Sequence, residues 1–438
     1  MSFVILQNFW WFLVLIGVMI IIHELGHYWA ARFFDVKVET FSFGFGPRLF
    51  GFRKGETDFR FAAILFGGYV KMAGEQPGDE NAADPRSFLQ KPRWQRLIIA
   101  FAGPAMNILL AVTVLAGLFM VRFPKIPTTN SPVVGYVVPD SAAAKAGIRE
   151  GDRVVQIDNT SDPTWEDVGM KEVASAGHPL SVWIVRNGER KLVTVTPVLD
   201  HKTGAGFAGW AEESQIEIAG VLPDKPAAKA GIQLGDIVVS VNGEPVRSTP
   251  KLHDIISNNG GKPVEIVYSR NGKLATVTLT PSPSDTDGTQ KWMIGVSLQP
   301  RVVFVSLSLP RALVESVRQN TKSATFIYQF LRGIVERRMS PKSLEGPIRI
   351  AQLSGEAARE GPTAYFGLAA MLSLNLAIVN MLPIPILDGG VILLLLVEMF
   401  MRRDLSLRVK EAALKLGFVF LMGVVAFAIY NDISKLAG

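Results

Sequence analysis

The sequence predicts an α-helical membrane protein with four transmembrane helices, a membrane-associated β-hairpin segment and two tandem α+β domains. Two observations support this fold class. Four apolar stretches are long enough to cross the ~30 Å hydrocarbon core of a bilayer, and hydrophobic residues make up 48% of the 438-residue chain. Between the second and third stretches one motif occurs twice, which indicates a duplicated domain.

The apolar stretches lie near the two ends of the chain. The third is too long for one straight helix and is interrupted by Pro383 and Pro385. No small-residue cleavage site follows the first, so we expect it to be retained rather than removed as a signal peptide. The expected spans are about Phe3–Ala30, Leu97–Val121, Ala364–Met401 and Ala412–Tyr430.

The first span ends in an HExxH motif formed by His23, Glu24 and His27. Residues four apart share one face of a helix, so both imidazoles can bind one metal ion. Glu24 can then reach a water molecule beside that ion, an arrangement that suits zinc. The alternative is a chance HExxH on a solvent-facing helix. The apolar run Phe9–Ile22 argues against it, because ionisable residues inside such a segment are costly and usually functional.

The composition excludes several other kinds of site. The chain has no cysteine, which excludes a Cys-ligated zinc site, a disulfide framework and a cysteine nucleophile. The formal net charge of +6 is modest for this length and no basic block stands out, so we expect no nucleic-acid partner.

Charge in the loops predicts the orientation in the membrane. The segment 32–96 is rich in Lys and Arg, and the short loop before the fourth span carries Arg402, Arg403, Arg408 and Lys410. The positive-inside rule places these loops in the cytoplasm, with both termini and residues 122–363 outside. We therefore expect a multi-pass membrane protein whose HExxH motif lies toward the cytoplasm.

The first cytoplasmic segment predicts β-hairpins. Residues 40–47 alternate aromatic and small side chains, and Asp58–Met72 suggests two short strands around a turn that contains Gly67 and Gly68. Such backbone at membrane depth must pack on protein or line a cavity. Its edge could pair with an extended substrate, which would make Gly67 and Gly68 substrate-binding residues. An ordinary cytoplasmic hairpin is the open alternative.

The repeated motif resembles the opening signature of bacterial PDZ domains. Pro139-Asp140 and Ala146-Gly147-Ile148 in the first copy recur as Pro223-Asp224 and Ala230-Gly231-Ile232, so the fold class includes two tandem α+β PDZ domains. The resemblance implies binding of peptide C-termini by strand addition. It places Gly209 and Gly295 in the two carboxylate-binding loops, although the first loop departs from the usual pattern. Domains that act only as steric spacers are the alternative.

These features divide the chain into five segments. Leu313–Val335 has apolar residues at helical spacing but too many charges for a span, so we expect an amphipathic helix on the outer membrane surface. Gly346-Pro347 then indicates a loop. The expected segments are 1–121 with two spans and the hairpins, 127–213 and 214–300 as PDZ domains, 301–363 as outer helix and loop, and 364–438 with the last two spans.

The third metal ligand is expected from the third span. Asp388 is an acid between apolar residues, beside a stretch interrupted by proline, and almost no basic partner is available in the spans. Glu398, the other acid nearby, is expected to form an ion pair with the cytoplasmic arginines. Asn107 in the second span is expected to make an interhelical hydrogen bond.

Together these motifs resemble the site-2 protease family of intramembrane zinc metalloproteases. HExxH in the first span, a GPxxN-like start to the second and NxxPxPxLDG in the third carry the resemblance. The tandem insert indicates the bacterial regulator-of-sigma-E protease group. The resemblance implies Zn²⁺ bound by His23, His27 and Asp388, with Glu24 as general base and acid. It also implies that Asn380 holds substrate near the metal.

The resemblance further implies a location in the bacterial inner membrane, with the active site toward the cytoplasm, and proteolysis of single-span membrane proteins within or near the bilayer. The implied substrates are an anti-sigma factor in envelope stress signalling and signal-peptide remnants. Two alternatives remain at this point: a non-catalytic membrane-tethered PDZ scaffold and a zinc transporter. A scaffold would leave the ionisable residues in the spans unexplained, and a transporter has no need of Glu24 as a base.

Overall fold

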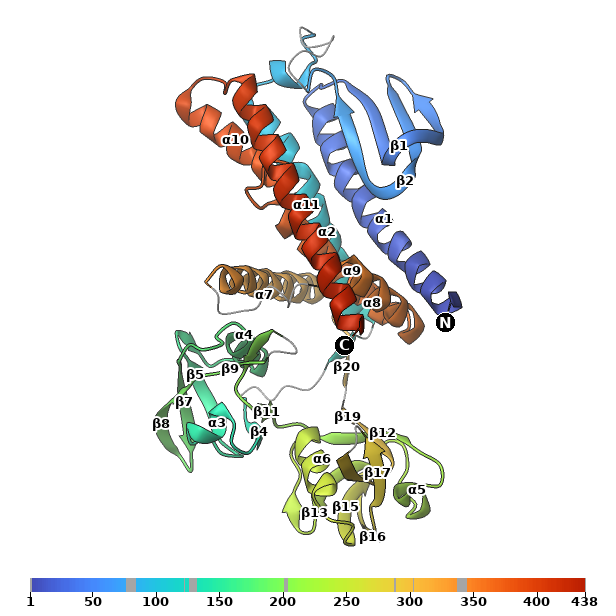
Figure 1. The fold of residues 1–438 in the computed structure, drawn as a ribbon, viewed down its shortest axis with the longest axis vertical. Helices are drawn as coiled ribbons and strands as arrows, with labels where there is room; N and C mark the ends of the chain where they lie inside the picture. Colours follow the sequence, from blue (N-terminus) through green and yellow to red (C-terminus); the bar gives the residue numbers. More distant parts are fainter. Residues whose placement is uncertain are drawn as a thin grey trace. The chain divides into compact units, whose positions relative to one another are not determined.

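The structure is a computed structural model that describes residues 2–75, 84–121, 123–125, 132–200, 204–286, 289–301, 303–336 and 345–437 (Figure 1). The chain forms two compact units. The first unit, which we call the membrane unit, comprises 1–123, 306–328 and 344–438. The second, the repeat unit, comprises 124–305 and 329–343.

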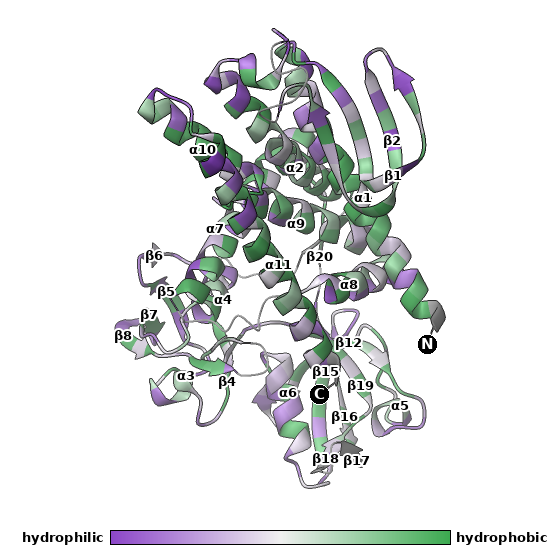
Figure 2. Ribbon diagram, turned by 45° about the horizontal axis from the view of Figure 1, so that its top comes forward, coloured by the Kyte–Doolittle hydropathy of each residue, from purple (hydrophilic) through white to green (hydrophobic). Residues whose placement is uncertain are grey.

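Four helices of the membrane unit are long and apolar enough to cross a membrane. They are α1 (Ser2–Phe33), α2 (Arg93–Val121), α9 (Pro362–Asn380) and α11 (Leu407–Ala437). Figure 2 shows hydrophobic residues along these helices. Many of the apolar side chains are exposed, as expected for residues that contact lipid rather than a protein core.

The expected third span is two helices rather than one interrupted helix. α9 ends at Asn380, and α10 (Asp388–Met401) begins at Asp388 after a turn. The glycines after Asp388 allow the close packing of that turn: a Cβ on Gly389 would lie 2.4 Å from the carbonyl oxygen of Leu382, and the backbone at Gly390 is equally crowded. The turn therefore ends the first helix and places Asp388 at the start of the next.

The segment after α1 forms one twisted sheet from two long strands, β1 (Val38–Lys54) and β2 (Thr57–Met72). Each strand bends, so that Phe43 pairs with both Phe61 and Gly68. The two short strands expected within Asp58–Met72 correspond to 58–61 and 68–71, which both pair with 40–43. The chain turns back between them, within 62–67, so Gly68 lies in the second pairing segment rather than in the turn. The register of a bent strand depends on its pairing partners, which the local pattern does not specify.

Small residues and polar contacts bring α1, α2 and α9 together. A Cβ on Gly26 of α1 would lie 2.8 Å from the Met106 side chain on α2 and nearer still to the α2 backbone. Ser373 on α9 donates a hydrogen bond to the carbonyl of Asn107 over 2.8 Å. Close approach through small residues is how helices associate where lipid removes the hydrophobic driving force.

Two further helices belong to the membrane unit, α7 (Leu309–Val335) as far as residue 328 and α8 (Pro347–Glu360) in full. α7 is the expected amphipathic helix with an earlier start, and Ser316 near its beginning donates to the carbonyl of Val112 on α2 over 2.7 Å. α8 replaces the loop expected at Gly346-Pro347. Asp432 of α11 accepts hydrogen bonds from the first backbone N–H groups of α8, beginning with Gly346 at 2.9 Å. This tertiary cap satisfies donors that the local sequence leaves free.

The repeat unit contains two copies of the same order of elements, each around its own apolar core. From the second element to the last but one, corresponding elements begin 84 residues apart, whereas the first strands begin 82 and the last strands 86 residues apart. The first copy contains β4 (Val134–Val137), α3 (Ala142–Lys145), β5 (Arg153–Ile157), β6 (Thr160–Ser161), α4 (Trp165–Val173), β7 (Leu180–Arg186), β8 (Glu189–Val195), β9 (Val198–Asp200), β10 (Ala205–Phe207) and β11 (Trp210–Glu212). The second contains β12 (Ile216–Val221), α5 (Pro226–Lys229), β13 (Ile237–Val241), β14 (Glu244–Pro245), α6 (Thr249–Ser257), β15 (Val264–Arg270), β16 (Lys273–Leu279), β17 (Ser282–Thr286), β18 (Thr289–Met293) and β19 (Val296–Pro300).

Sheet pairing in the two copies follows the same plan. The central strands pair in the order β6-β5-β7-β8 in the first copy and β14-β13-β15-β16 in the second. Each copy also pairs its first and last strands, β4 with β11 and β12 with β19. Short strands β3 (Phe123–Lys125) and β20 (Val303–Val305) pair with each other where the chain enters and leaves the repeats.

Candidate metal centre

Two helices from opposite ends of the chain bring His23, His27 and Asp388 together. His23 and His27 lie one turn apart on α1, and Asp388 is the first residue of α10. The Nε2 atoms of the histidines are 3.2 Å apart. Asp388 Oδ2 lies 3.1 Å from His23 Nε2, and Asp388 Oδ1 lies 3.4 Å from His27 Nε2. Three potential ligand atoms therefore meet at one point.

Neighbouring groups on α2 orient both imidazoles. His27 Nδ1 donates to the carbonyl of Ile99 over 2.8 Å, which leaves Nε2 free to face Asp388. The side-chain amide of buried Asn107 lies 3.3 Å from His23 Nδ1. Its Oδ1 has no partner, and turning the amide over makes Oδ1 an acceptor for the Nδ1–H of His23. His23 Nε2 is then also free to bind a metal. In metal sites, a hydrogen bond to one ring nitrogen of a histidine commonly leaves the other nitrogen for the metal in this way.

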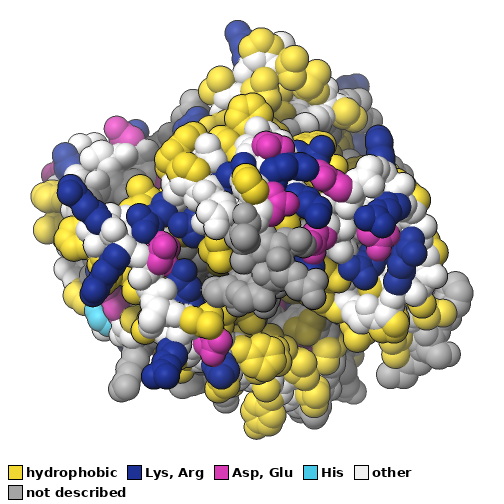
Figure 3. Space-filling model, turned by 90° about the horizontal axis from the view of Figure 1, so that it is seen from above, with side chains coloured by type: hydrophobic (Ala, Val, Ile, Leu, Met, Phe, Trp, Pro, Cys, Tyr) yellow, Lys and Arg dark blue, Asp and Glu magenta, His cyan; other side chains and the backbone are white. Residues whose placement is uncertain are grey.

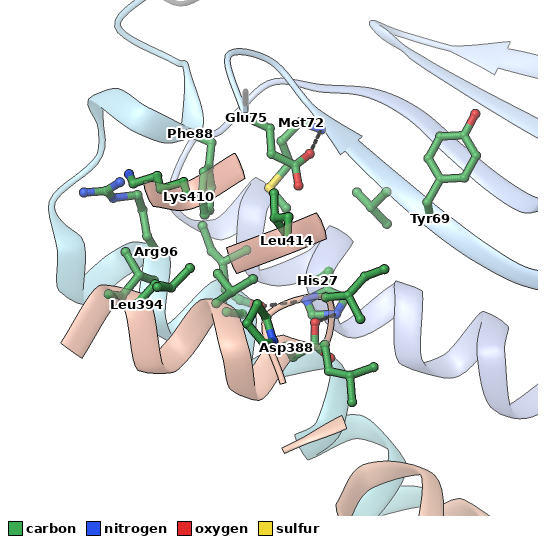
Figure 4. Close-up of a pocket in the computed structure, with 18 of the residues that line it drawn as sticks. His27, Tyr69, Met72, Glu75, Phe88, Arg96, Asp388, Leu394, Lys410 and Leu414 are labelled. Atoms are coloured by element: carbon green, nitrogen blue, oxygen red, sulfur yellow. Dashed lines mark hydrogen bonds and ion pairs between the residues drawn. The ribbon is translucent and has the colours of Figure 1, made fainter. Parts of the chain in front are cut away.

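Glu24 lies in the same cavity as these three residues. The cavity has a volume of about 580 Å³ and is lined by parts of α1, β2, α2, α10 and α11 (Figure 4). The carboxylate of Glu24 interacts with the backbone N–H of Val70 on β2. A group that could move a proton is thus held beside the potential metal ligands.

The other predicted site residues lie at different distances from this centre. Asn380, at the end of α9, has its amide nitrogen 3.4 Å from His23 Nε2. Gly68 lines the cavity, and a Cβ there would lie 3.2 Å from the Glu24 side chain. Gly67 packs against the Phe45 ring, whereas Gly209 and Gly295 belong to the repeat unit.

A second polar group lines the far side of the cavity. Glu398 on α10 is buried, and its Oε1 lies 2.7 Å from Lys410 Nζ. The guanidinium of Arg96 lies 3.9 Å from the other oxygen. The ion pair expected for Glu398 is therefore present, although its nearer partner is Lys410 rather than one of the arginines. Figure 4 shows Arg96 and Lys410 apart from Asp388 and His27 within the same pocket.

Charged side chains also gather at the end of the membrane unit that carries the α10–α11 loop. Arg93 at the start of α2 pairs with Asp404 over 2.8 Å and holds the pKa of that carboxyl below its usual range. Arg86 pairs with Glu56 over 2.6 Å. Figure 3, viewed from above, shows Lys and Arg side chains interspersed with Asp and Glu on this face.

The residues present fit a zinc ion. Two imidazole nitrogens and one carboxylate are the donor set of catalytic zinc sites, which leave a position open for water or substrate. Gly103 on α2 provides the space, because any side chain there would fill the point at which the two Nε2 atoms meet. Asn107 was expected only to make a hydrogen bond between helices. Its bond indeed joins two helices, but its partner is a potential ligand, which no feature of the local sequence reveals.

A model of a known protein family matches most of this chain. The sequence model of peptidase family M50 matches residues 11–424. The chain belongs to peptidase family M50. The M50 assignment confirms the metallopeptidase predicted from HExxH, and it disfavours both the scaffold and the transporter.

Relatives of this M50 chain match along nearly its full length. A protein of Xylella fastidiosa described as a candidate zinc metalloprotease is 33% identical, over 98% of this chain and 99% of its own. The regulator of sigma-E protease RseP of Salmonella typhimurium is 30% identical over 99% of both chains. RseP of Escherichia coli is 29% identical over 97% and 98% of the two. A solved PDZ domain from Listeria monocytogenes, 24% identical, covers 19% of this chain and 87% of its own with a TM-score of 0.18, too low to carry an argument.

Proposed function

We propose that this protein is an intramembrane zinc endopeptidase in which His23, His27 and Asp388 hold the metal. The observation that carries the proposal is the meeting of three ligand atoms from α1 and α10 beside Glu24. When bound there, zinc supplies a Lewis acid that polarises a carbonyl and lowers the pKa of a water molecule. Family membership supports a peptide bond as the target.

The chain's own residues then move the proton and hold the peptide. The Glu24 carboxylate takes a proton from the attacking water and delivers it to the leaving amine nitrogen. The backbone of Val70 keeps that carboxylate directed into the cavity. The amide of Asn380, within 3.4 Å of His23, is placed to donate to a substrate carbonyl.

We propose that the substrate is held as an extended strand on β2. The peptide groups of a transmembrane helix are hydrogen-bonded to one another within the helix. The helix must therefore unwind locally before a protease can reach a peptide bond. Gly68, Tyr69, Val70 and Met72 line the cavity that contains Glu24. Pairing with this part of β2 would replace the hydrogen bonds that an unwound substrate loses. In this proposal Gly67 and Gly68 keep the strand free of side chains that would block a partner.

The proposed location is the bacterial inner membrane, with the active site toward the cytoplasm. Lys and Arg residues between α1 and α2 and between α10 and α11 support this orientation. The repeats and both termini would then face the periplasm. We further propose that the two repeats, at about 127–213 and 214–300, are PDZ domains that contact peptides, followed by an outer-surface segment at 301–363.

Single-span membrane proteins are the proposed substrates. Relatives named as regulators of sigma-E protease support an anti-sigma factor of envelope stress signalling. Signal-peptide remnants have the same single-helix form and are a second proposed substrate class.

One experiment tests the catalytic proposal directly. The purified chain in detergent is assayed for zinc content and for cleavage of a model transmembrane peptide. We expect about one zinc ion per chain from the three-ligand set and cleavage that a chelator abolishes. Asp388→Ala should lower zinc content and remove cleavage. Cleavage by the metal-free protein, or a normal zinc content in Asp388→Ala, would contradict the proposal.

A further inference from the structure

The first repeat ends in a loop with a defined backbone form. The carbonyl of Ala208 accepts a hydrogen bond from the N–H of Ala143 over 2.8 Å, and the carbonyl of Gly209 accepts one from Val138 over 2.7 Å. Gly209 has a φ of +85°, a conformation that favours glycine. Because both carbonyls are bonded to the body of the repeat, the N–H groups of Ala208 and Gly209 are left to an acceptor outside this backbone pattern.

The second repeat has the same loop. The carbonyl of Ile294 accepts from Ala227, and the carbonyl of Gly295 accepts from Leu222, both over 2.9 Å. Gly295 has a φ of +80°. The two loops are therefore equivalent in backbone form and in the residues that anchor them.

Within the part of the chain that the structure describes, a carboxylate of the same domain contacts the first loop, and none contacts the second. Glu172, on the last turn of α4, accepts hydrogen bonds through both oxygens: Oε1 from Ala208 N over 2.5 Å and Oε2 from Trp210 Nε1 over 2.8 Å. The N–H of Gly209 also interacts with this carboxylate. Burial in this pocket raises the pKa of Glu172 above its usual range despite these donors.

The second repeat differs from the first at two positions around this loop. The position of Glu172 is taken on α6 by Ile256, which is buried in the apolar core of the second repeat. Beside the loop glycine, the first repeat has Ser141 and the second has Lys225. Among the described residues, the second loop thus has the aliphatic stem of a lysine beside its glycine and no carboxylate of its own domain bound to its N–H groups.

We propose that Glu172 is a built-in ligand of the first loop and closes it to the C-terminal carboxylate of a peptide. The same N–H groups cannot serve two carboxylates, and like charges at that distance repel. A side chain of the same domain also has a high effective concentration, because it loses no translational freedom on binding. Partners of the first repeat must then be recognised without their C-terminal carboxylate. This inference deepens the proposed peptide-binding role of the repeats.

Hydrogen exchange of the full chain in detergent tests the contact itself. Glu172→Ala should speed exchange of the backbone amides in 205–212 by about tenfold, the effect of losing a hydrogen bond to a charged group. Glu166→Ala removes the same charge from an exposed position on the same helix and should leave that segment unchanged. If Glu172→Ala unfolds the whole repeat, Glu172→Gln keeps the shape, and the same segment should exchange faster. Unchanged exchange in the variant that stays folded overturns the proposal.

A peptide probe tests the consequence. Photo-crosslinking hexapeptides of random sequence, ending in Val, Leu or Phe, are prepared with a free C-terminal carboxylate or as C-terminal amides. In the unmodified chain, labelling of 132–213 should not depend on the carboxylate. In Glu172→Ala, labelling by the free acids should rise about tenfold, because the Glu172 carboxylate no longer competes for the N–H groups of the loop. Labelling by the amides should stay the same.

The outcomes separate this inference from the proposed peptide-binding role. Acid-dependent labelling of 132–213 in the unmodified chain would overturn the inference. Absence of labelling in every variant would count against peptide binding by the repeats, and the exchange measurement would still decide whether Glu172 occupies the loop.

Discussion

Gly103 of α2 lies directly against His23 of α1. A Cβ at Gly103 would lie 2.8 Å from His23 Nε2 and closer still to His27 Nε2, so glycine alone leaves the histidine nitrogens accessible. The GPxxN sequence thus contributes to the candidate site twice, through the space at Gly103 and through the amide of Asn107.

Replacing Gly103 with alanine is therefore expected to remove zinc binding. The added methyl group occupies the place where the metal must sit, and we expect a loss of at least about 100-fold in zinc affinity, the upper range for disturbed metal surroundings. Metal analysis of the purified variant measures the effect. Gly117→Ala is the matched control, because a Cβ there meets no other atom within 4 Å. Equal zinc content in the two variants would contradict the assigned site.

Glu24→Gln is expected to keep zinc and lose proteolysis. The amide has the size of the carboxylate but cannot accept a proton, and the three ligands remain. Cleavage of a model transmembrane peptide should fall about 10²- to 10⁴-fold, the usual contribution of a general base. Zinc content measured on the same sample distinguishes this result from loss of the metal. Cleavage at the unmodified rate would exclude Glu24 as the base.

A proline at Val70 tests the proposed substrate strand. Proline removes the N–H that faces Glu24 and distorts the edge available to a partner strand. We expect severe loss of cleavage with normal zinc content. Val70→Ala keeps the N–H and controls for the lost side chain. If the proline variant cleaves as fast as the alanine variant, strand pairing at this edge is not required.

Deletion of residues 127–300 tests whether the two repeats filter substrates by size. Paired strands β3 and β20 bring the ends of this segment together, so the chain can be rejoined without strain on the helices. We expect the shortened protein to cleave single-span substrates that still carry bulky outer domains, which the complete protein should reject. Loss of activity toward every substrate, including trimmed ones, would leave a filter unsupported.

The stability of the second repeat is expected to depend on pH through Asp236. Its buried carboxylate accepts two hydrogen bonds from Arg270, at 2.7 and 2.6 Å, and its pKa is lowered. A lowered folded-state pKa means that the stabilisation is present above the ordinary Asp value of about 3.9 and is lost as the pH falls through the folded value. Hydrogen exchange across 214–300 should show Asp236→Asn less stable than the unmodified chain at pH 7. The difference should shrink below about pH 3.9, and a difference that is constant with pH would refute this account.

Local periodicity in the sequence is enough to predict several parts of this protein. Helical spacing makes His23 and His27 a potential metal pair wherever the helix lies, and an apolar run makes a candidate span of the helix that carries them. Asp388 could be identified because a carboxylate between apolar residues has no structural reason to be there. The duplicated motif likewise predicted two copies of one domain, whose elements the structure places at corresponding positions.

Tertiary structure alone decided the contacts between segments far apart in the chain. The bend of β2 near Ala62–Ile64, the partner of Asn107 and the cap that Asp432 provides to α8 each depend on a neighbour that local pattern cannot specify. The same holds for Glu172, which looks like an ordinary polar residue of a helix until the fold brings the loop of Ala208 to it. Hydrogen-bond donors are satisfied by whatever acceptor packing places beside them, and packing is a property of the whole chain.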